Sequence, residues 1–269
     1  MEAGTYREHT HGSELTPRSR VDGSSPLSFA NWKTIGNMSK ISAQNGISMQ
    51  RAYHFVSLRH GLDDLSQRHL KISRLDDLND PFELWAIAQS DRRVREGIAA
   101  TKAEMSRQFG LLCFSLDWHN PLLWSHYAER HRGLALGFDV DEQILEPVSY
   151  RKTRPVLTTI DPKVAHWLLF TKYIGWDYEQ EARIFTSLED RDSETNLYFA
   201  KFSKQLILRE VIAGPLCTAT ERELREVTAL TPEIKFTRAR LAFKTFRVVA
   251  DRRGFPNSLD ASRRSRRDS

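Results

Sequence analysis

Two glutamates one residue apart, Glu179 and Glu181, have the clearest potential for chemistry in this sequence. They lie in the stretch Lys172–Phe185, at the predicted start of a strand, where side chains at i and i+2 point to the same face. Two like charges this close repel each other, so the pair needs solvent, basic partners such as Lys172 and Arg183, or a substrate that develops positive charge. A solvated strand face balanced by Arg183 is the structural alternative.

Three other segments carry polar residues among aromatic ones. His54 interrupts the apolar run Ala52–Val56, where it is either a core histidine bonded to a backbone carbonyl or a ligand-binding residue. Asn79 and Asp80 precede a proline, which predicts an Asx turn, although such a loop also presents amide and carboxylate groups to a ligand.

The third segment contains Trp124 and Tyr127, which are three residues apart in a predicted short helix. This spacing places both rings on one helical face. They form either a plain hydrophobic wall or a surface on which a planar ligand stacks. His126 and His131 lack a third ligand at a recognisable spacing, so we predict no metal site.

The composition indicates a soluble domain in a reducing compartment, which we expect to be the cytoplasm. The chain has 269 residues, a mass of 31.1 kDa and 40% hydrophobic residues, enough for a sizeable core. Its two cysteines, Cys113 and Cys217, argue against a disulfide framework and against a multi-thiolate zinc site. No apolar run approaches the roughly 20 residues of a membrane helix, so no membrane partner is predicted.

The charge and residue types divide the chain into three parts. Residues 1–48 are rich in Ser, Gly, Thr and Asn without periodicity, which predicts a disordered or loosely ordered segment. Residues 49–250 carry 29 basic and 28 acidic residues and are predicted to form a single α+β domain of catalytic type. Residues 251–269 contain six arginines against three aspartates, which is typical of a flexible, weakly anion-binding tail.

The apolar patterns predict many strands and few helices. Strands are expected at 52–56, 70–73, 111–116, 132–139, 147–151, 206–213, 234–236 and 243–249, besides the strand of the paired glutamates. Helices are expected at 58–69, 92–109, 122–128, 161–173 and 220–229, the last one opened by a capping box. Strands and long helices do not alternate regularly, so the pattern favours an α+β fold with segregated helices.

Five segments in this order resemble a bacterial domain-of-unknown-function family, number 2971, over roughly residues 50–250. They are Tyr53-His54-Phe55, Asn79-Asp80-Pro81-Phe82-Glu83, Cys113-Phe114-Ser115, Trp124-Ser125-His126-Tyr127 with Gly133–Asp139, and Trp176–Arg183. The resemblance suggests a relative but no reaction.

A weaker resemblance supplies a reaction. A histidine on the first strand, an aromatic residue in the middle of the chain and a late Glu-x-Glu are similar to the His-Tyr-Glu layout of ADP-ribosyltransferases. That resemblance implies split, paired β-sheets that hold NAD as a substrate. His54 would bind the ribose, Tyr127 or Trp124 would stack on nicotinamide, Glu181 would stabilise the sugar cation, and Glu179 would contact or deprotonate the acceptor.

We also predict that Asn79, Asp80 and Arg183 contribute to the NAD-binding cleft, although the loop of Asn79 and Asp80 has no counterpart in the transferase layout. The acceptor would be a protein or a nucleic acid, and the enzyme would act as a bacterial toxin or a phage-defence effector. Two alternatives remain open. One is a metal-dependent nuclease in which Asp80, Glu179 and Glu181 bind magnesium, and the other is a non-catalytic interaction module.

Overall fold

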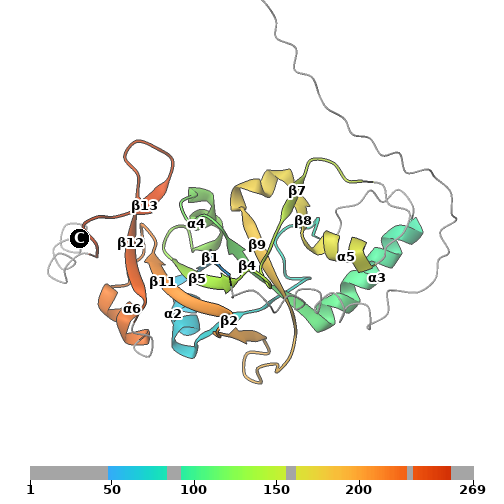
Figure 1. Ribbon diagram of the computed structural model, residues 1–269, viewed down its shortest axis with the longest axis horizontal. Coiled ribbons are helices and arrows are strands. Elements are labelled where there is room, and N and C mark those ends of the chain that lie inside the picture. The colour runs from blue at the N-terminus through green and yellow to red at the C-terminus, as the bar shows by residue number, and fades with distance from the viewer. Residues whose placement is uncertain (1–47, 84–91, 156–161, 229–232, 256–269) are drawn as a thin grey trace, which may run out of the picture.

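The computed structural model describes residues 48–83, 92–155, 162–228 and 233–255 of the chain (Figure 1). Its helices are α2 (Leu58–Gln67), α3 (Arg92–Gln108), α4 (Pro121–Tyr127), α5 (Pro162–Leu169) and α6 (Glu221–Val227), with a 3-10 helix η1 (Ile174–Glu179). Its strands are β1 (Met49–Val56), β2 (His69–Lys71), β3 (Ser73–Arg74), β4 (Phe109–Ser115), β5 (Leu134–Asp141), β6 (Glu146–Pro147), β7 (Ser149–Arg151), β8 (Thr171–Tyr173), β9 (Glu181–Ser187), β10 (Phe199–Lys201), β11 (Leu206–Ala213), β12 (Lys235–Leu241) and β13 (Val248–Ala250).

A large curled sheet dominates the part of the chain described. It has nine strands in the order β13-β12-β11-β5-β1-β4-β9-β6, with β3 added to β4. Most neighbours are antiparallel, whereas β11 and β12 are parallel. Two small two-stranded sheets, β10-β2 and β7-β8, stand beside it. The molecule is therefore a mixed protein with one large sheet and few helices, as an α+β fold requires.

Neighbouring strands of the sheet pair along most of their length, except at the junction between β1 and β4. β1 pairs with β5 along eight registered positions, from Met49 to Val56. By contrast, β1 and β4 share a single pair, Tyr53 opposite Ser115. The two strands therefore diverge beside this pair, which opens a space between them.

Side-chain alternation explains how the sheet is covered on both faces. In β5, Leu134, Leu136 and Phe138 belong to a core cluster that also takes in Leu65 of α2 and Leu224 of α6. Ala135 faces the other way, into a cluster with Trp124 of α4. Because strand side chains alternate with period two, the same strand buries one face under α2 and α6 and the other under α4.

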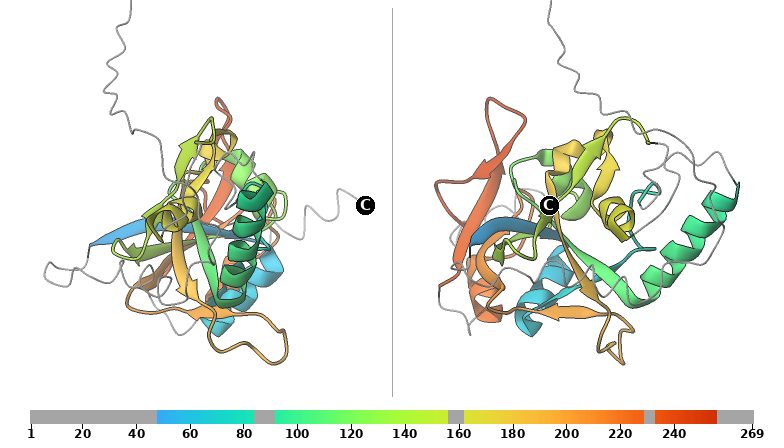
Figure 2. Two further views of the ribbon diagram at one scale, coloured as in Figure 1. Left: turned by 90° about the vertical axis from the view of Figure 1, so that its right-hand side faces the viewer. Right: turned by 45° about the vertical axis from the view of Figure 1, so that its right-hand side comes forward.

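The right-hand end of the molecule in Figure 1 is formed by α3 and α5, and the right view of Figure 2 shows α3 at the opposite end from the β12–β13 hairpin. Phe109 and Leu111 of β4 pack there with Met105 of α3 and Leu168 of α5. These contacts fix β4 and β9, the strands that lead into the polar centre described below.

An unusual turn positions α4. Glu129, Arg130 and His131 have φ angles of 49°, 53° and 70°, so three successive residues adopt the left-handed conformation. The backbone amide of His131 donates to the carbonyl of Trp124 over 2.9 Å, and that of Gly133 donates to Ala128 over 2.8 Å. A side chain at Gly133 would meet the carbonyl oxygen of Val56 at 2.1 Å, so the turn can lie against β1 only with glycine here.

Several predicted elements are confirmed and several are wrong. The strand at 206–213 and the capping box of Thr220 and Glu223 are present as expected. The helix expected over 161–173 ends at Leu169, because Thr171–Tyr173 instead pairs in parallel with β7. The strand expected at 147–151 is divided between β6 and β7, since the amide of Val148 donates to the carbonyl of Glu181 between them.

The boundaries of the domain also differ from expectation. Residues 251–255, predicted to begin a flexible tail, belong to the fold: the amide of Asp251 donates to Arg238 over 2.7 Å, and Phe255 packs against the main core. The predicted disordered segment 1–48 lies outside the described residues apart from Ser48, as does the tail from residue 256 onward. No helix in the described part of the chain is long and apolar enough to cross a membrane.

Candidate functional site

A cavity of about 260 Å³ opens where β1 and β4 diverge. Its walls include Tyr53, His54 and Phe55 of β1 and Cys113, Phe114 and Ser115 of β4. The polar residues that line it are Ser73, Asp77, Asn79, Glu83, Tyr127, Lys172, Glu179, Glu181 and Arg183. Residues from five separate parts of the sequence thus converge on one space, and both glutamates are among them.

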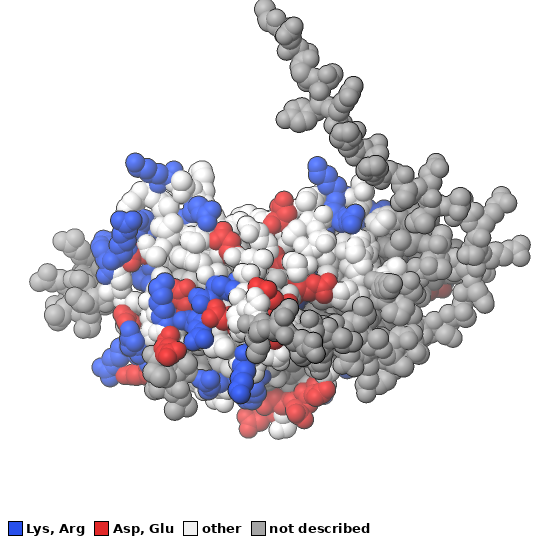
Figure 3. Space-filling model, in the orientation of Figure 1, with Lys and Arg blue, Asp and Glu red and all other residues white. Residues whose placement is uncertain are grey.

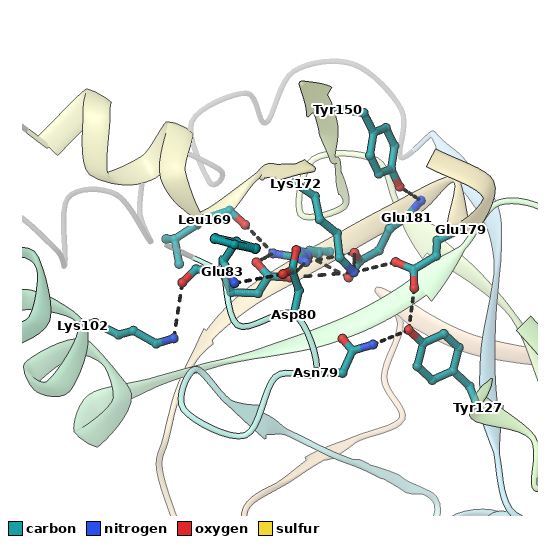
Figure 4. A network of polar contacts seen from close by, with 12 residues as sticks. Asn79, Asp80, Glu83, Lys102, Tyr127, Tyr150, Leu169, Lys172, Glu179 and Glu181 are labelled. Carbon is teal, nitrogen blue, oxygen red and sulfur yellow. Dashed lines mark hydrogen bonds and ion pairs between the residues drawn. The ribbon is translucent and has the colours of Figure 1, made fainter. Parts of the chain in front are cut away.

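Lys172 holds three carboxylates together at one side of this cavity (Figure 4). Its Nζ lies 2.6 Å from Glu179 Oε2, 3.1 Å from Glu181 Oε2 and 3.7 Å from Glu83 Oε1. All four side chains are almost completely buried. Charged groups are found in such a place only when they are paired and hydrogen-bonded.

Arg183 is the second cation of the network. Its guanidinium donates from Nε and Nη2 to Glu181 over 2.8 and 2.9 Å, and from Nη1 and Nη2 to Glu83 over 3.0 and 2.6 Å. Nη1 also donates to the carbonyl of Leu169 over 2.7 Å. The Arg183 side chain is 1% exposed, and these five bonds use all five of its N–H donors. Arg183 lines the cavity, so its predicted role in binding a ligand stays a prediction, and its donors serve the two glutamates and the carbonyl of Leu169.

The network carries one net negative charge, since three carboxylates face two cations. Burial by itself would raise the pKa of Glu181, but the charges of Arg183 and Lys172 outweigh burial and lower it to about 2. Burial raises the pKa of Glu179 above its ordinary value, and the attraction of Lys172 only partly offsets this. Glu181 is thus ionised at any ordinary pH, whereas Glu179 exchanges a proton more readily.

The backbone explains how two neighbouring glutamates reach one lysine. Glu179 ends the 3-10 helix η1, Gln180 has a left-handed φ of 43°, and Glu181 opens β9. The two side chains do point together, but the prediction that strand alternation aligns them is wrong. A turn between helix and strand does it instead, and Ser115 Oγ donates to the carbonyl of Glu179 over 2.6 Å to hold that turn.

Tyr127 connects the network to α4. Its hydroxyl donates to Glu179 Oε1 over 2.5 Å and accepts from Nδ2 of Asn79 over 2.5 Å. Burial, and next the bond to Glu179, raises the pKa of Tyr127, so its hydroxyl keeps its proton. The structure therefore brings Asn79, Tyr127 and Glu179 together, as sequence reasoning expected, and shows that the hydroxyl of Tyr127 fixes a carboxylate.

His54 lies on β1 at the edge of the cavity. Its Nδ1 is 3.0 Å from the carbonyl of Cys113, so Nδ1 carries the proton and donates. Burial lowers the pKa of His54, which keeps the ring neutral. Nε2 is then an acceptor, suited to a hydroxyl group of a ligand. The carbonyl-bonded histidine expected as the structural alternative is present, and it lines the cavity as well.

Trp124 does not line the cavity. It is fully buried, its Nε1 donates to the carbonyl of Trp118 over 2.6 Å, and it packs edge-on against Phe55. The prediction that Trp124 stacks on a ligand is wrong, because the helical turn that directs Tyr127 to Glu179 directs Trp124 into the core.

The loop 79–83 supplies a residue that sequence reasoning missed. Asp80 is buried and caps the turn, since its Oδ1 accepts from the amide of Phe82 over 2.9 Å, while its Oδ2 has no hydrogen-bond partner. Asp80 does not line the cavity, so its predicted contact with a ligand is wrong. The turn instead delivers Glu83, whose carbonyl also accepts from Lys102 over 3.3 Å. In the sequence the two glutamates already balance Lys172 and Arg183, so no unpaired charge indicated a third carboxylate.

Metal ligation was one alternative for these carboxylates. Within the described residues no three or more His, Cys, Asp or Glu side chains are arranged to hold a metal ion. Lys172 lies between Glu179 and Glu181, and Asp80 serves its own turn. The three residues named for the nuclease alternative therefore do not form one ligand set.

Comparisons with protein-family models, curated proteins and solved structures found no match to this chain. The resemblances to family 2971 and to the ADP-ribosyltransferases accordingly stay predictions.

Proposed function

We propose that this domain is an ADP-ribosyltransferase-like enzyme that binds NAD in the cavity and transfers its ADP-ribose to a protein or nucleic-acid acceptor, or to water. The observation that carries the proposal is the network of Glu83, Glu179 and Glu181 around Lys172 and Arg183, which places one net negative charge against the cavity. Such a site favours a ligand that is positive or becomes positive during the reaction.

Cleavage of NAD meets that requirement. When the bond between ribose C1′ and the nicotinamide nitrogen breaks, its electron pair passes to the ring, which loses its positive charge as the ribose becomes an oxocarbenium ion. An acceptor hydroxyl, amine or water then bonds to C1′ and loses a proton. Both the bound pyridinium and the sugar cation are positive species, so a preorganised negative charge stabilises them throughout.

The two glutamates suit different parts of this reaction. Glu181 keeps its charge because its pKa is about 2, and its oxygens are engaged by Arg183 and Lys172, so it would act on the sugar cation through its charge. Glu179, with a pKa raised by burial, is better suited to take the proton from the acceptor.

The walls of the cavity fit a sugar and a flat ring. His54 offers Nε2 to a ribose hydroxyl, since its Nδ1 is used by Cys113. Tyr53, Phe55 and Tyr127 line the same space and offer aromatic surface. The volume of about 260 Å³ is slightly below the roughly 300–1,000 Å³ of typical ligand pockets, so it suits the nicotinamide and ribose end of NAD.

The sheet supports the same interpretation. β1 and β4 share one registered residue pair within the large sheet, and the cavity lies beside that junction. A split sheet around NAD is what the resemblance to ADP-ribosyltransferases implies. We expect the enzyme to act in a reducing cytoplasm, where NAD is at hand and both cysteines stay free, as a toxin or phage-defence effector.

Release of nicotinamide from NAD by the full chain tests the proposal. Wild-type protein should release nicotinamide, faster when protein or nucleic-acid acceptors are present. Glu181→Gln keeps the shape of the side chain and removes its charge, so it should lower the rate about 10²-fold or more while NAD still binds. Glu142→Gln, at an exposed position, is the matched control and should leave the rate unchanged.

Other outcomes separate the alternatives. If the folded chain neither binds NAD by calorimetry nor releases nicotinamide, the proposal is wrong. Cleavage of nucleic acid that needs magnesium and is abolished by Glu181→Gln would then indicate the nuclease, and stable partner binding without either reaction would indicate an interaction module.

A further inference from the structure

The hairpin of β12 and β13 exposes two phenylalanines at its tip. Phe243 is 87% exposed and Phe246 is 98% exposed, although both lie in a part of the fold that is tied to its neighbours. The amide of Ala242 donates to Arg247 over 2.9 Å, and the amide of Val248 donates to His119 over 2.8 Å. Large aromatic rings held in solvent by an ordered loop contribute nothing to the core, which points to a binding role.

Cations alternate with these rings. Arg240 places its guanidinium 4.4 Å from the centroid of Phe243, and Lys244 and Arg247 occupy the same loop. Arg247 contacts Asp117 over 3.2 Å, whereas Lys244 has no ion-pair partner in the described part of the chain. Rings and cations therefore share one surface within a few residues.

Basic residues are concentrated at this end of the described chain. Residues 235–253 hold seven basic residues and one acidic residue, a net charge of +6, whereas the complete chain has +5. Figure 3 shows Lys and Arg gathered at the end that carries β12, β13 and α6. A local positive field of this kind attracts a polyanion to the hairpin.

We propose that the β12–β13 hairpin is a binding surface for single-stranded nucleic acid. The phosphates would contact Arg240, Lys244 and Arg247, and unpaired bases would stack on Phe243 and Phe246. Sites for single strands combine a positive surface with aromatic rings in this way, because every base presents a flat face. Arginine suits such a site, since its guanidinium both pairs with phosphate and stacks on rings.

A duplex and a membrane fit the same surface less well. Paired bases are stacked on one another and leave no face for the rings, so a duplex would use only the cations. For a membrane, two phenylalanines at one tip supply little apolar area, and the positive charge continues past the hairpin to Arg252 and Arg253 at its base. The proposal concerns binding and does not depend on the reaction at the cavity.

Binding of a labelled 20-nucleotide single strand to the full chain without NAD tests the proposal, with a duplex of the same sequence beside it. The double variant Phe243→Leu/Phe246→Leu keeps apolar side chains and removes the flat rings. It should weaken binding of the single strand about 10-fold or more and change binding of the duplex by less than about twofold. Because both rings are exposed, its thermal unfolding should match wild type.

Arg240→Gln/Lys244→Gln should weaken both nucleic acids and reduce the dependence of the affinity on salt. The matched charge control is Arg92→Gln on α3, at the opposite end of the molecule (Figures 1 and 2), which should change neither. Equal affinity of wild type and the leucine variant for the single strand would overturn the proposal. The proposal would also be overturned if the chain binds no oligonucleotide, while wild type and the leucine variant both bind vesicles of anionic lipid.

Discussion

Glu83 and Arg183, a hundred residues apart in the sequence, form a buried ion pair with two parallel hydrogen bonds of 2.6 and 3.0 Å. The pair joins the turn after Asp80 to β9 and so closes one side of the cavity. Burial would lower the pKa of Arg183, but Glu181 and Glu83 together raise it well above its ordinary value. Arg183 therefore stays charged although it is almost completely buried.

Glu83→Gln should destabilise the domain by about 3–5 kcal/mol at pH 7, because it leaves a buried guanidinium without one of its two carboxylates. Urea unfolding followed by circular dichroism measures the change. The control is Glu226→Gln, which breaks the exposed pair with Arg222 and should cost less than about 0.5 kcal/mol. Similar losses for both variants would contradict a structural role for the buried pair.

Tyr127→Phe should move the acid limb of the activity profile to higher pH. The hydroxyl of Tyr127 donates to Glu179 and thereby stabilises its ionised form, so its removal raises the pKa of Glu179 further. Rates of nicotinamide release measured from pH 4 to 9 test this. Infrared titration of the carboxyl groups gives the same information without activity.

Tyr198→Phe is the control: its ring packs against the main core and does not line the cavity, so the profile should stay in place. An acid limb that stays fixed in Tyr127→Phe would show that Glu179 is not the group that must be ionised.

Asp64→Asn should stabilise the domain at pH 8 and have little effect at pH 4. Burial, and next the charge of Asp63, raises the pKa of Asp64 from 3.8 to about 7. A carboxyl whose folded-state pKa is raised contributes stability that is fully present below about pH 3.8 and is lost as the pH rises through 7. The neutral amide avoids this loss, which amounts to about 2–4 kcal/mol at about 1.4 kcal/mol per pKa unit.

Urea unfolding of wild type and Asp64→Asn at both pH values measures the difference. Asp190→Asn, at an exposed turn, should show no gain at either pH. The difference in unfolding free energy between Asp64→Asn and wild type should be larger at pH 8 than at pH 4. If it is the same at both pH values, the carboxyl of Asp64 does not titrate between them.

Thr220→Ala should lower the stability by about 1 kcal/mol, because the threonine hydroxyl accepts from the amide of Glu223 and the Glu223 carboxylate accepts from the amide of Thr220. The control is Thr218→Ala, two residues earlier in the same loop and exposed to solvent. A cost that is equal for both threonines would indicate that the capping box contributes nothing specific.

Local patterns predicted those elements that depend on local interactions. β11 was expected at 206–213 because an apolar run ends there at Gly214 and Pro215, and the structure has these limits. The capping box and the turn at Asp80 were predictable for the same reason, since the groups that bond lie within three residues of each other.

The site was predictable only in part, because long-range pairing decides it. Thr171–Tyr173 follows a helical pattern, but β7 recruits it as a strand, and this places Lys172 between the two glutamates. Nothing near Glu83 in the sequence indicates that its partner is Arg183. Trp124 and Tyr127 look alike in the sequence, and only the packing of α4 separates a core residue from a site residue.

The five charges of Glu83, Lys172, Glu179, Glu181 and Arg183 also restrict how this domain can change. Replacing any one of them alone shifts the local balance by a full charge at a buried position, so each single replacement is expected to cost stability. Substitutions that remove a carboxylate and a cation together conserve the balance. In variants that differ at this cavity, we therefore expect positions 83 and 183 to change together, or positions 172 and 179 to change together.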